Sequence, residues 1–189
     1  MADPSASFQA RRAQCLRRAA AAIAILATPV CASLPAQAQA GTDQVGSATG
    51  LPVPRYVSLK SDRVNLREGP SKDHRTAWVF QRAGLPVEVT AEFEQWRRIR
   101  DSEGAEGWVL NSLLSGRRTA LVAPWRKGEI IPLFSKANSG SDQIANLQPG
   151  VLGSVRRCEG GWCRLSGEKF DGFVQQSALW GVYPNEKFE

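Results

Sequence analysis

The sequence predicts an all-β protein built from two tandem copies of one small barrel or sandwich. The first observation is an internal repeat: residues 84–114 recur as residues 149–179, and matching positions such as Trp96 and Trp162 are 66 residues apart. The second is the pattern within each copy, where short apolar stretches are separated by closely spaced turns. A repeat of this length indicates duplication of a whole domain, because solenoid repeats are shorter.

Each part of the repeated unit has a predicted element. Residues 85–90 carry an apolar side chain at every second position, which indicates a strand with one buried face. Trp96 and Ile99 are an odd number of positions apart and cannot share a face of one regular strand. We therefore expect Trp96 in the hairpin turn and Ile99 in the core. Residues 107–110 are predicted to form the next strand, and residues 111–114 a short helical turn that closes the sheet.

Four motifs of the first copy follow one another in a family-specific order. They are Val64-Asn65-Leu66-Arg67-Glu68-Gly69-Pro70-Ser71, then Gly84 with Val87 and Val89, then Trp96 with Ile99, then Gly107-Trp108-Val109. Together they resemble the bacterial SH3-like (SH3b) domain family over about residues 56–115. In the second copy, residues 131–136 (IPLFSK) replace the Asn-Leu-Arg run. The resemblance implies two tandem SH3-like barrels of five or six strands that act as targeting or binding modules of the cell envelope.

Residues 1–40 have the order of a secretory signal peptide. Four arginines precede an apolar run at residues 19–34, and small residues follow, so we expect cleavage after Ala40 or Ala38. A permanent anchor helix is the alternative, but a run of about 16 residues is shorter than the roughly 20 that span a bilayer. We therefore expect a periplasmic or secreted protein with no stable membrane anchor after cleavage.

The remaining chain is expected to contain a leader and two barrels. Residues 41–54 are rich in small and polar residues and predict a flexible leader, followed by barrel 1 at residues 55–116 and barrel 2 at residues 117–184. Domains of this size bury only about 60% of the surface that their unfolded chain exposes, so an interface or a disulfide would help to stabilise them. The linker at residues 115–119 is short, which predicts that the barrels touch, and residues 120–122 are expected to open the second barrel.

The charge of the mature protein gives little support for nucleic-acid binding. The whole chain has 24 basic and 18 acidic residues, but four arginines and one aspartate lie in the predicted signal peptide, which leaves a net charge of +3. No run of like charges reaches five residues. We therefore expect no nucleic-acid partner.

Cys158 and Cys163 are the two cysteines outside the predicted signal peptide. Their counterparts 66 residues earlier are Glu92 and Arg97, which are expected to form an exposed ion pair across a hairpin. Opposed residues of an antiparallel pair have Cα atoms about 4.5–5.5 Å apart, which a disulfide can bridge, and an oxidising compartment favours the bond. The alternative is a redox or metal site, but the spacing is not Cys-x-x-Cys and two ligands alone do not hold zinc. We predict a structural disulfide.

The sequence indicates no catalytic residues, no metal site and no cofactor. His74 is the only histidine, no serine or cysteine has a base at a recognisable motif spacing, and no glycine-rich phosphate loop is present. Glu92 and Glu94 could form a pair of carboxylates, but solvated charges at a turn are the simpler interpretation. We therefore predict that the protein is not an enzyme.

The six tryptophans are the better indication of a site. Three occupy repeat positions and are interpreted as barrel structure, whereas Trp78, Trp125 and Trp180 lie outside the strict pattern. Exposed aromatic side chains in a groove can bind sugars or peptides. In SH3-like barrels the loop from Arg67 to His74 borders the binding groove, so the resemblance implies a groove formed by Arg67, His74 and Trp78.

Two functions are consistent with the sequence. The first is a non-enzymatic exported binding or adaptor module whose partner is cell-wall peptidoglycan or an envelope protein. The second is a structural or inhibitory subunit whose barrels pair edge-to-edge with one dedicated envelope protein.

Overall fold

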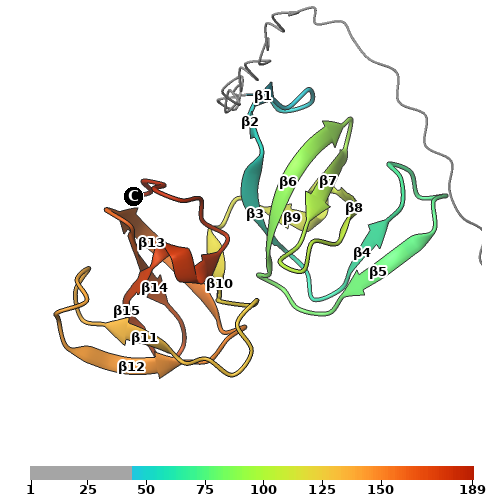
Figure 1. Ribbon diagram of the computed structural model, residues 1–189. Helices are drawn as coiled ribbons and strands as arrows, with labels where there is room; N and C mark the ends of the chain where they lie inside the picture. Colours follow the sequence, from blue (N-terminus) through green and yellow to red (C-terminus); the bar gives the residue numbers. More distant parts are fainter. Residues whose placement is uncertain (1–43) are drawn as a thin grey trace, which may run out of the picture. The chain divides into compact units, whose positions relative to one another are not determined.

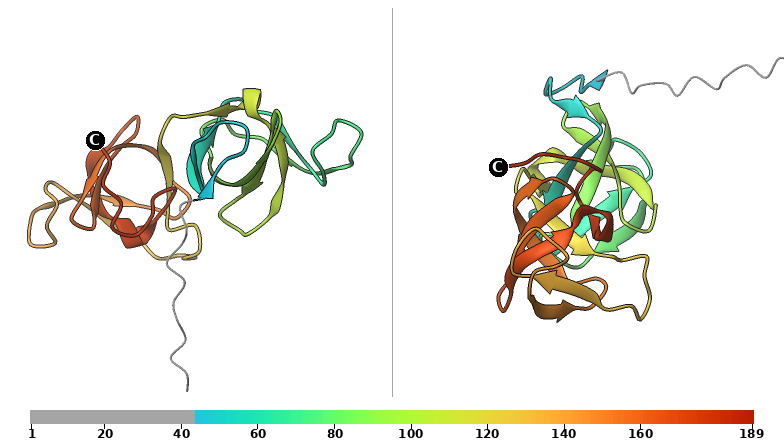
Figure 2. Two further views of the ribbon diagram at one scale, coloured as in Figure 1. Left: turned by 90° about the horizontal axis from the view of Figure 1, so that it is seen from above. Right: turned by 60° about the vertical axis from the view of Figure 1, so that its left-hand side comes forward.

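The computed structural model describes residues 44–189, so the predicted signal peptide lies outside the described residues. The fold class is confirmed: the described chain forms two tandem barrels of antiparallel strands, and its helices are two short 3-10 turns. Within this part of the chain, no helix is long and apolar enough to cross a membrane. Figure 2 shows each sheet curled around its own interior.

Barrel 1 contains seven strands in the sheet order β5-β4-β8-β7-β6-β3-β9 (Figure 1). In chain order they are β3 (Arg55–Leu59), β4 (Val64–Arg67), β5 (Thr76–Phe80), β6 (Pro86–Phe93), β7 (Trp96–Arg100), β8 (Glu106–Leu110) and β9 (Leu114–Ser115), with the 3-10 helix η1 (Asn111–Leu113) before β9. The short helical turn is thus confirmed, and η1 connects the last long strand to the strand that returns beside β3.

Barrel 2 repeats this topology in the sheet order β12-β11-β15-β14-β13-β10-β16. Its elements are β10 (Thr119–Val122), β11 (Ile131–Phe134), β12 (Gln143–Leu147), β13 (Leu152–Glu159), β14 (Trp162–Ser166), β15 (Asp171–Gln175), η2 (Gln176–Ala178) and β16 (Leu179–Trp180). The opening strand was predicted correctly. The divergent run IPLFSK also begins with a strand, because its alternate residues Ile131 and Leu133 are both buried.

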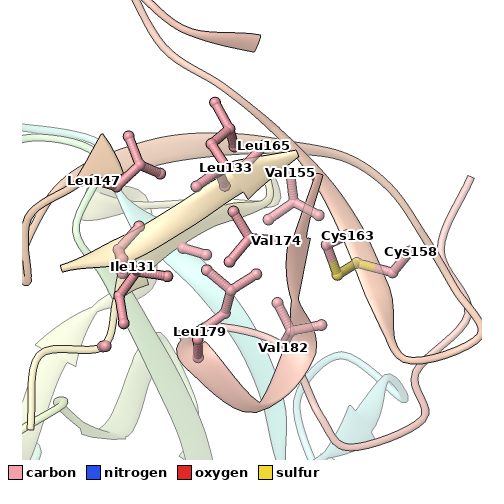
Figure 3. Packing of buried hydrophobic residues seen from close by; sticks show 14 residues of the cluster. Ile131, Leu133, Leu147, Val155, Cys158, Cys163, Leu165, Val174, Leu179 and Val182 are labelled. Carbon is pink, nitrogen blue, oxygen red and sulfur yellow. A yellow bond between two sulfur atoms is a disulfide. The ribbon is translucent and has the colours of Figure 1, made fainter. Parts of the chain in front are cut away.

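Each barrel has its own apolar core. In barrel 1 the buried side chains come from six strands: Leu59, Val64, Leu66, Phe80, Val87, Val89, Ile99 and Val109. In barrel 2 the core contains Ile131, Leu133, Leu147, Val155, Leu165, Val174, Leu179 and Val182, together with the two cysteines (Figure 3). Outside β6, most of these residues alternate with half-buried or exposed ones along their strands, which is the pattern of a sheet with one buried face.

The hairpin of β6 and β7 corrects the prediction for Trp96. Phe93 pairs with Trp96, so the two-residue turn is Glu94 and Gln95, and Trp96 is the buried first residue of β7. Glu94 has a positive φ of 48°, a left-handed conformation suited to such a tight turn. Trp96 and Ile99 do lie on opposite faces, as the odd spacing requires, but both faces of β7 are covered at these positions.

The disulfide between Cys158 and Cys163 is confirmed. The two residues are direct partners in the β13–β14 ladder, with Cα atoms 4.1 Å apart. Both side chains are buried, and Cys163 lies in the same core cluster as Leu165 (Figure 3). The disulfide therefore forms part of the barrel 2 core.

The corresponding pair in barrel 1 has the predicted register but not the predicted exposure. Glu92 and Arg97 are direct partners in the β6–β7 ladder. Their side chains are only 0% and 3% exposed, with Glu92 Oε1 3.4 Å from Arg97 Nε. The prediction of an exposed pair is therefore wrong, as is the interpretation of Glu92 as a solvated turn charge. Glu94, in contrast, is exposed at the turn.

Residues expected in the flexible leader are responsible for this burial. They form a small hairpin of β1 (Gln44–Val45) and β2 (Pro52–Val53), and the loop between these strands contacts Glu92. The carboxylate of Glu92 accepts hydrogen bonds from the Ala48 and Thr49 amides, each at 2.9 Å, and from Thr49 Oγ1 at 2.6 Å. Arg55 Nη2 completes the arrangement at 2.7 Å. The leader is thus ordered by polar contacts that its composition does not predict.

The two barrels lie within one compact unit and contact each other, as the short linker predicts. Thr119 Oγ1 donates to the Gly84 carbonyl at 2.7 Å, and Trp180 Nε1 donates to the Pro86 carbonyl at 3.1 Å. The Tyr183 hydroxyl donates to Glu88 Oε1 at 2.9 Å. Thr119 of β10, Trp180 of β16 and Tyr183 therefore bind the first part of β6 and the turn before it, which links the two small cores.

Candidate functional site

Trp78 is the largest exposed aromatic side chain of barrel 1. It lies on β5 directly opposite Leu66 of β4, and paired residues of a ladder share a face of the sheet. Leu66 is buried in the core, whereas Trp78 is 59% exposed. The difference arises because β5 is the outermost strand of its sheet and pairs only with β4. The strand thus holds an indole at the rim of the barrel, next to the core but open to solvent.

Trp78 lines a groove with a volume of about 700 Å³, within the range of small-molecule sites. The apolar part of the groove is formed by side chains of both barrels: Leu66, Trp78, Phe80, Leu85, Pro86, Leu121, Pro124 and Pro149. Phe80 and Leu66 also belong to the core of barrel 1. The floor of the groove is therefore continuous with a packed core, which makes it rigid.

Charged side chains of both signs surround this apolar floor. The acidic ones come from the β7–β8 turn and the start of β8 (Asp101, Glu103 and Glu106), and the basic ones are Arg82, Arg126 and Lys127. Asp101 Oδ1 accepts hydrogen bonds from the Glu103 and Ala105 amides, each at 2.9 Å, and so fixes the turn that carries Glu103.

Some of these charges are already paired. Glu106 binds Arg98 at 2.6 Å, and Arg126 binds Glu129 at 2.8 Å. Within residues 44–189, Arg82, Glu103 and Lys127 form no ion pair. The groove therefore offers an aromatic surface together with unpaired charges of both signs, an arrangement suited to a short ligand that carries an amine as well as a carboxylate.

Two of the three predicted site residues lie elsewhere. Arg67 Nη1 donates to the carbonyls of Lys72 and His74 at 2.9 and 2.7 Å, so its side chain braces the loop between β4 and β5. The His74 ring lies over Gly69, where a Cβ atom would approach it to 2.4 Å. The structure thus brings Arg67 and His74 together in one loop, and of the three only Trp78 lines the groove.

Sequence reasoning missed the groove residues that come from distant segments. Nothing in the sequence links the turn at residues 101–106 to Pro124, Arg126 and Lys127, which follow the opening strand of barrel 2. The one available signal was the position of Trp78 outside the repeat pattern: its counterpart opposite Leu133 in barrel 2 is Ala145. In the described residues, no group of three or more His, Cys, Asp or Glu side chains is placed to hold a metal ion.

Comparison with known families agrees with the two-barrel architecture. The family model described as "Bacterial SH3 domain" matches residues 60–116 and 127–181, which is more than half of the chain. The protein belongs to the bacterial SH3 domain family. Domains of this family are non-catalytic modules that typically bind the cell wall. This assignment makes the Trp78 groove a candidate binding site.

Comparisons with individual proteins add little. No curated protein matches the chain. Among solved structures, NlpC2 from Trichomonas vaginalis matches with 11% identity over 67% of this chain and 48% of its own, and NlpC1 from the same organism with 10% identity over 71% and 48%. The chain thus spans about half the length of these structures. Both TM-scores are 0.30, too low to support an inference.

Proposed function

We propose that this protein is an exported, non-enzymatic envelope module that binds peptidoglycan through the Trp78 groove of its first barrel. The observation that carries the proposal is the 59% exposed Trp78 above a rigid apolar floor, with unpaired charges of both signs around it. Membership of a family of cell-wall binding domains supports the same partner. The order of charged, apolar and small residues in positions 1–40 supports export.

The peptide portion of peptidoglycan has the chemistry that this groove would recognise. Stem peptides are short and carry carboxylates, and in many bacteria the free amine of a diamino acid. Arg82 and Lys127 would bind a carboxylate, and Glu103 would bind an amine. Trp78 and Phe80 would contact the aliphatic parts of the peptide, because aromatic side chains contribute large contact areas at binding sites.

A pull-down with purified peptidoglycan tests this function. The mature protein should sediment with the polymer, and Trp78→Ala should weaken the interaction about 10-fold or more, as expected for loss of a central aromatic contact. Phe93→Ala is the matched control, because Phe93 is also an exposed aromatic residue of barrel 1 but does not line the groove. If Trp78→Ala instead lowers the melting temperature strongly, or leaves sedimentation unchanged, the groove assignment is wrong.

One observation favours the second candidate, a dedicated envelope protein partner. β5 and β12 are the outermost strands of their sheets, and unpaired strand edges can pair with another chain. Crosslinking in cells separates the two functions: a single protein adduct through residues of β5, together with no binding to purified peptidoglycan, would favour the partner protein.

The same preparations test export and the absence of activity. The exported protein should begin at Gly41 or Gln39, and an N-terminus at Met1 would contradict cleavage. Purified cell wall incubated with the protein should release no soluble fragments. Release that a single point substitution abolishes would show that the protein is a hydrolase.

A further inference from the structure

Barrel 2 has a second hollow whose chemistry differs from that of the Trp78 groove. It has a volume of about 570 Å³ and is lined only by residues 125–185, so it lies on barrel 2 alone. Six charged residues line the Trp78 groove, whereas none lines this hollow. Its polar wall consists of amide and hydroxyl side chains: Gln175, Gln176, Ser177 and Asn185. The hollow therefore suits an uncharged ligand.

Two tryptophans contribute to this hollow. Trp125 is 51% exposed on a turn closed by a hydrogen bond from the Arg126 amide to the Ala123 carbonyl, 2.9 Å. Trp162 is the half-buried first residue of β14, and Phe134 packs edge-on against it with ring centroids 5.5 Å apart. Trp162 is thus held in place before any ligand binds. In barrel 1 the equivalent Trp96 is buried, so this feature is specific to the second copy.

Gln176 supplies an independent indication of a ligand. It is 6% exposed. Its backbone N–H donates to the Gly161 carbonyl at 2.8 Å, and its side-chain Nε2 donates to the Glu186 carbonyl at 2.7 Å. The second of these bonds fixes the orientation of the side chain. Within the described residues, Gln176 Oε1 has no hydrogen-bond partner. Buried acceptors are rarely left unpaired, because an unmade hydrogen bond is costly.

We propose that this hollow binds a neutral N-acetylated amino sugar of the peptidoglycan glycan strand. An indole face can contact the C–H groups of a sugar ring, and amide and hydroxyl side chains can pair with its hydroxyl and acetamido groups. The proposal rests on the proposed function, and it assigns the two barrels to the peptide and the sugar of one polymer. Two linked sites on one polymer bind more tightly together than either site alone.

The test uses soluble oligomers of N-acetylglucosamine, which contain no peptide, and isothermal titration calorimetry on the mature protein. The oligomers should bind, Trp125→Ala should weaken binding about 10-fold, and Trp125→Phe should retain most of it because an aromatic face remains. Trp78→Ala is the matched control and should leave binding unchanged. Oligomers of unacetylated glucosamine should bind more weakly, because they lack the acetamido group and carry charge.

The outcomes separate this inference from the proposed function. If the oligomers do not bind at millimolar concentration while peptidoglycan still sediments with the protein, the sugar site is overturned and the peptide groove is retained. Oligomer binding that is insensitive to Trp125→Ala also overturns it, as does binding of a proline-rich peptide in place of the sugar. If oligomers bind but sedimentation is insensitive to Trp78→Ala, the sugar site stands and the Trp78 groove does not.

Discussion

The two barrels link the strands of one hairpin at equivalent positions through different side-chain chemistry. In barrel 2, the paired residues Cys158 and Cys163 form a disulfide. In barrel 1, the paired residues Glu92 and Arg97 form a buried ion pair. The disulfide needs no further partner for its sulfur atoms, whereas the buried carboxylate requires four additional hydrogen bonds from the leader and Arg55.

A short segment outside the barrel sheet covers the hairpin in both barrels. The leader loop binds Glu92, and the C-terminal tail pairs with the other hairpin through two backbone hydrogen bonds between Cys158 and Phe188, 2.7 and 3.0 Å. Burial without partners would be costly for a charge but not for a disulfide. The comparison therefore indicates that barrel 1 depends on its leader more strongly than barrel 2 depends on its tail.

The largest expected effect is that of Glu92→Ala. The substitution leaves Arg55 and Arg97 without their carboxylate, and an uncompensated buried charge costs about 3–5 kcal/mol of unfolding free energy. It also removes the acceptor that holds Ala48 and Thr49, so the leader should become sensitive to protease. Chemical denaturation and limited proteolysis measure the two effects. A loss below about 1 kcal/mol would mean that the pair is solvated.

Removal of the disulfide should cost somewhat less. Replacing both cysteines by alanine should lower the unfolding free energy by about 2–4 kcal/mol, because the unfolded chain gains freedom and the core loses sulfur contacts. Mass spectrometry under non-reducing conditions establishes the bond, and denaturation of the double variant gives its contribution. Free thiols in the exported protein would contradict the predicted pairing.

The register of these hairpins could be predicted from the sequence, but the environment of barrel 1 could not. Both pairs follow from one 66-residue separation, because each hairpin has a two-residue turn and keeps the same alternation of faces. The burial of Glu92 depends on Thr49 and Arg55, which lie outside the duplicated segments that gave the 66-residue separation. Trp78 could be singled out because it lies outside the repeat pattern. The charges around its groove could not be predicted, because they come from segments that only the folded chain brings together.

Acidification should weaken barrel 1 through Glu92. Burial alone would raise the pKa of the Glu92 carboxyl, but hydrogen bonds from Thr49, Arg55 and two backbone amides outweigh it and lower the pKa from 4.5 to about 2. A lowered pKa in the folded state contributes stability that is fully present above about pH 4.5 and is lost as the pH falls towards 2. The effect should be smaller than that of Glu92→Ala, because protonation leaves the side chain in place.

The pH dependence is measured against Glu92→Gln, which keeps the shape of the side chain but cannot titrate. The difference in unfolding free energy between the parent protein and this variant should be largest above pH 4.5 and should shrink towards pH 2. The amide NMR signals of Ala48 and Thr49 should report the same change locally. A constant difference across this range would show that another carboxyl group is responsible.

The smallest expected effect comes from an ion pair that both barrels retain. Arg98 binds Glu106 at 2.6 Å in barrel 1, and Arg164 binds Asp171 at 2.8 Å at the equivalent position in barrel 2. Both pairs lie on the outer face of their sheets with half-exposed side chains, where solvent screens the attraction, so Arg98→Ala should cost at most about 1 kcal/mol. The change in thermal midpoint caused by Arg164→Ala should not differ measurably from the change caused by Arg98→Ala.

If Arg98→Ala lowered the unfolding free energy as much as Glu92→Ala, burial would not explain why the barrel 1 hairpin depends on its leader. Equal and small stability losses at these matched surface positions would instead show that the two barrels differ in stability at the hairpin ends. There, barrel 1 has the ion pair of Glu92 and Arg97, and barrel 2 has the disulfide.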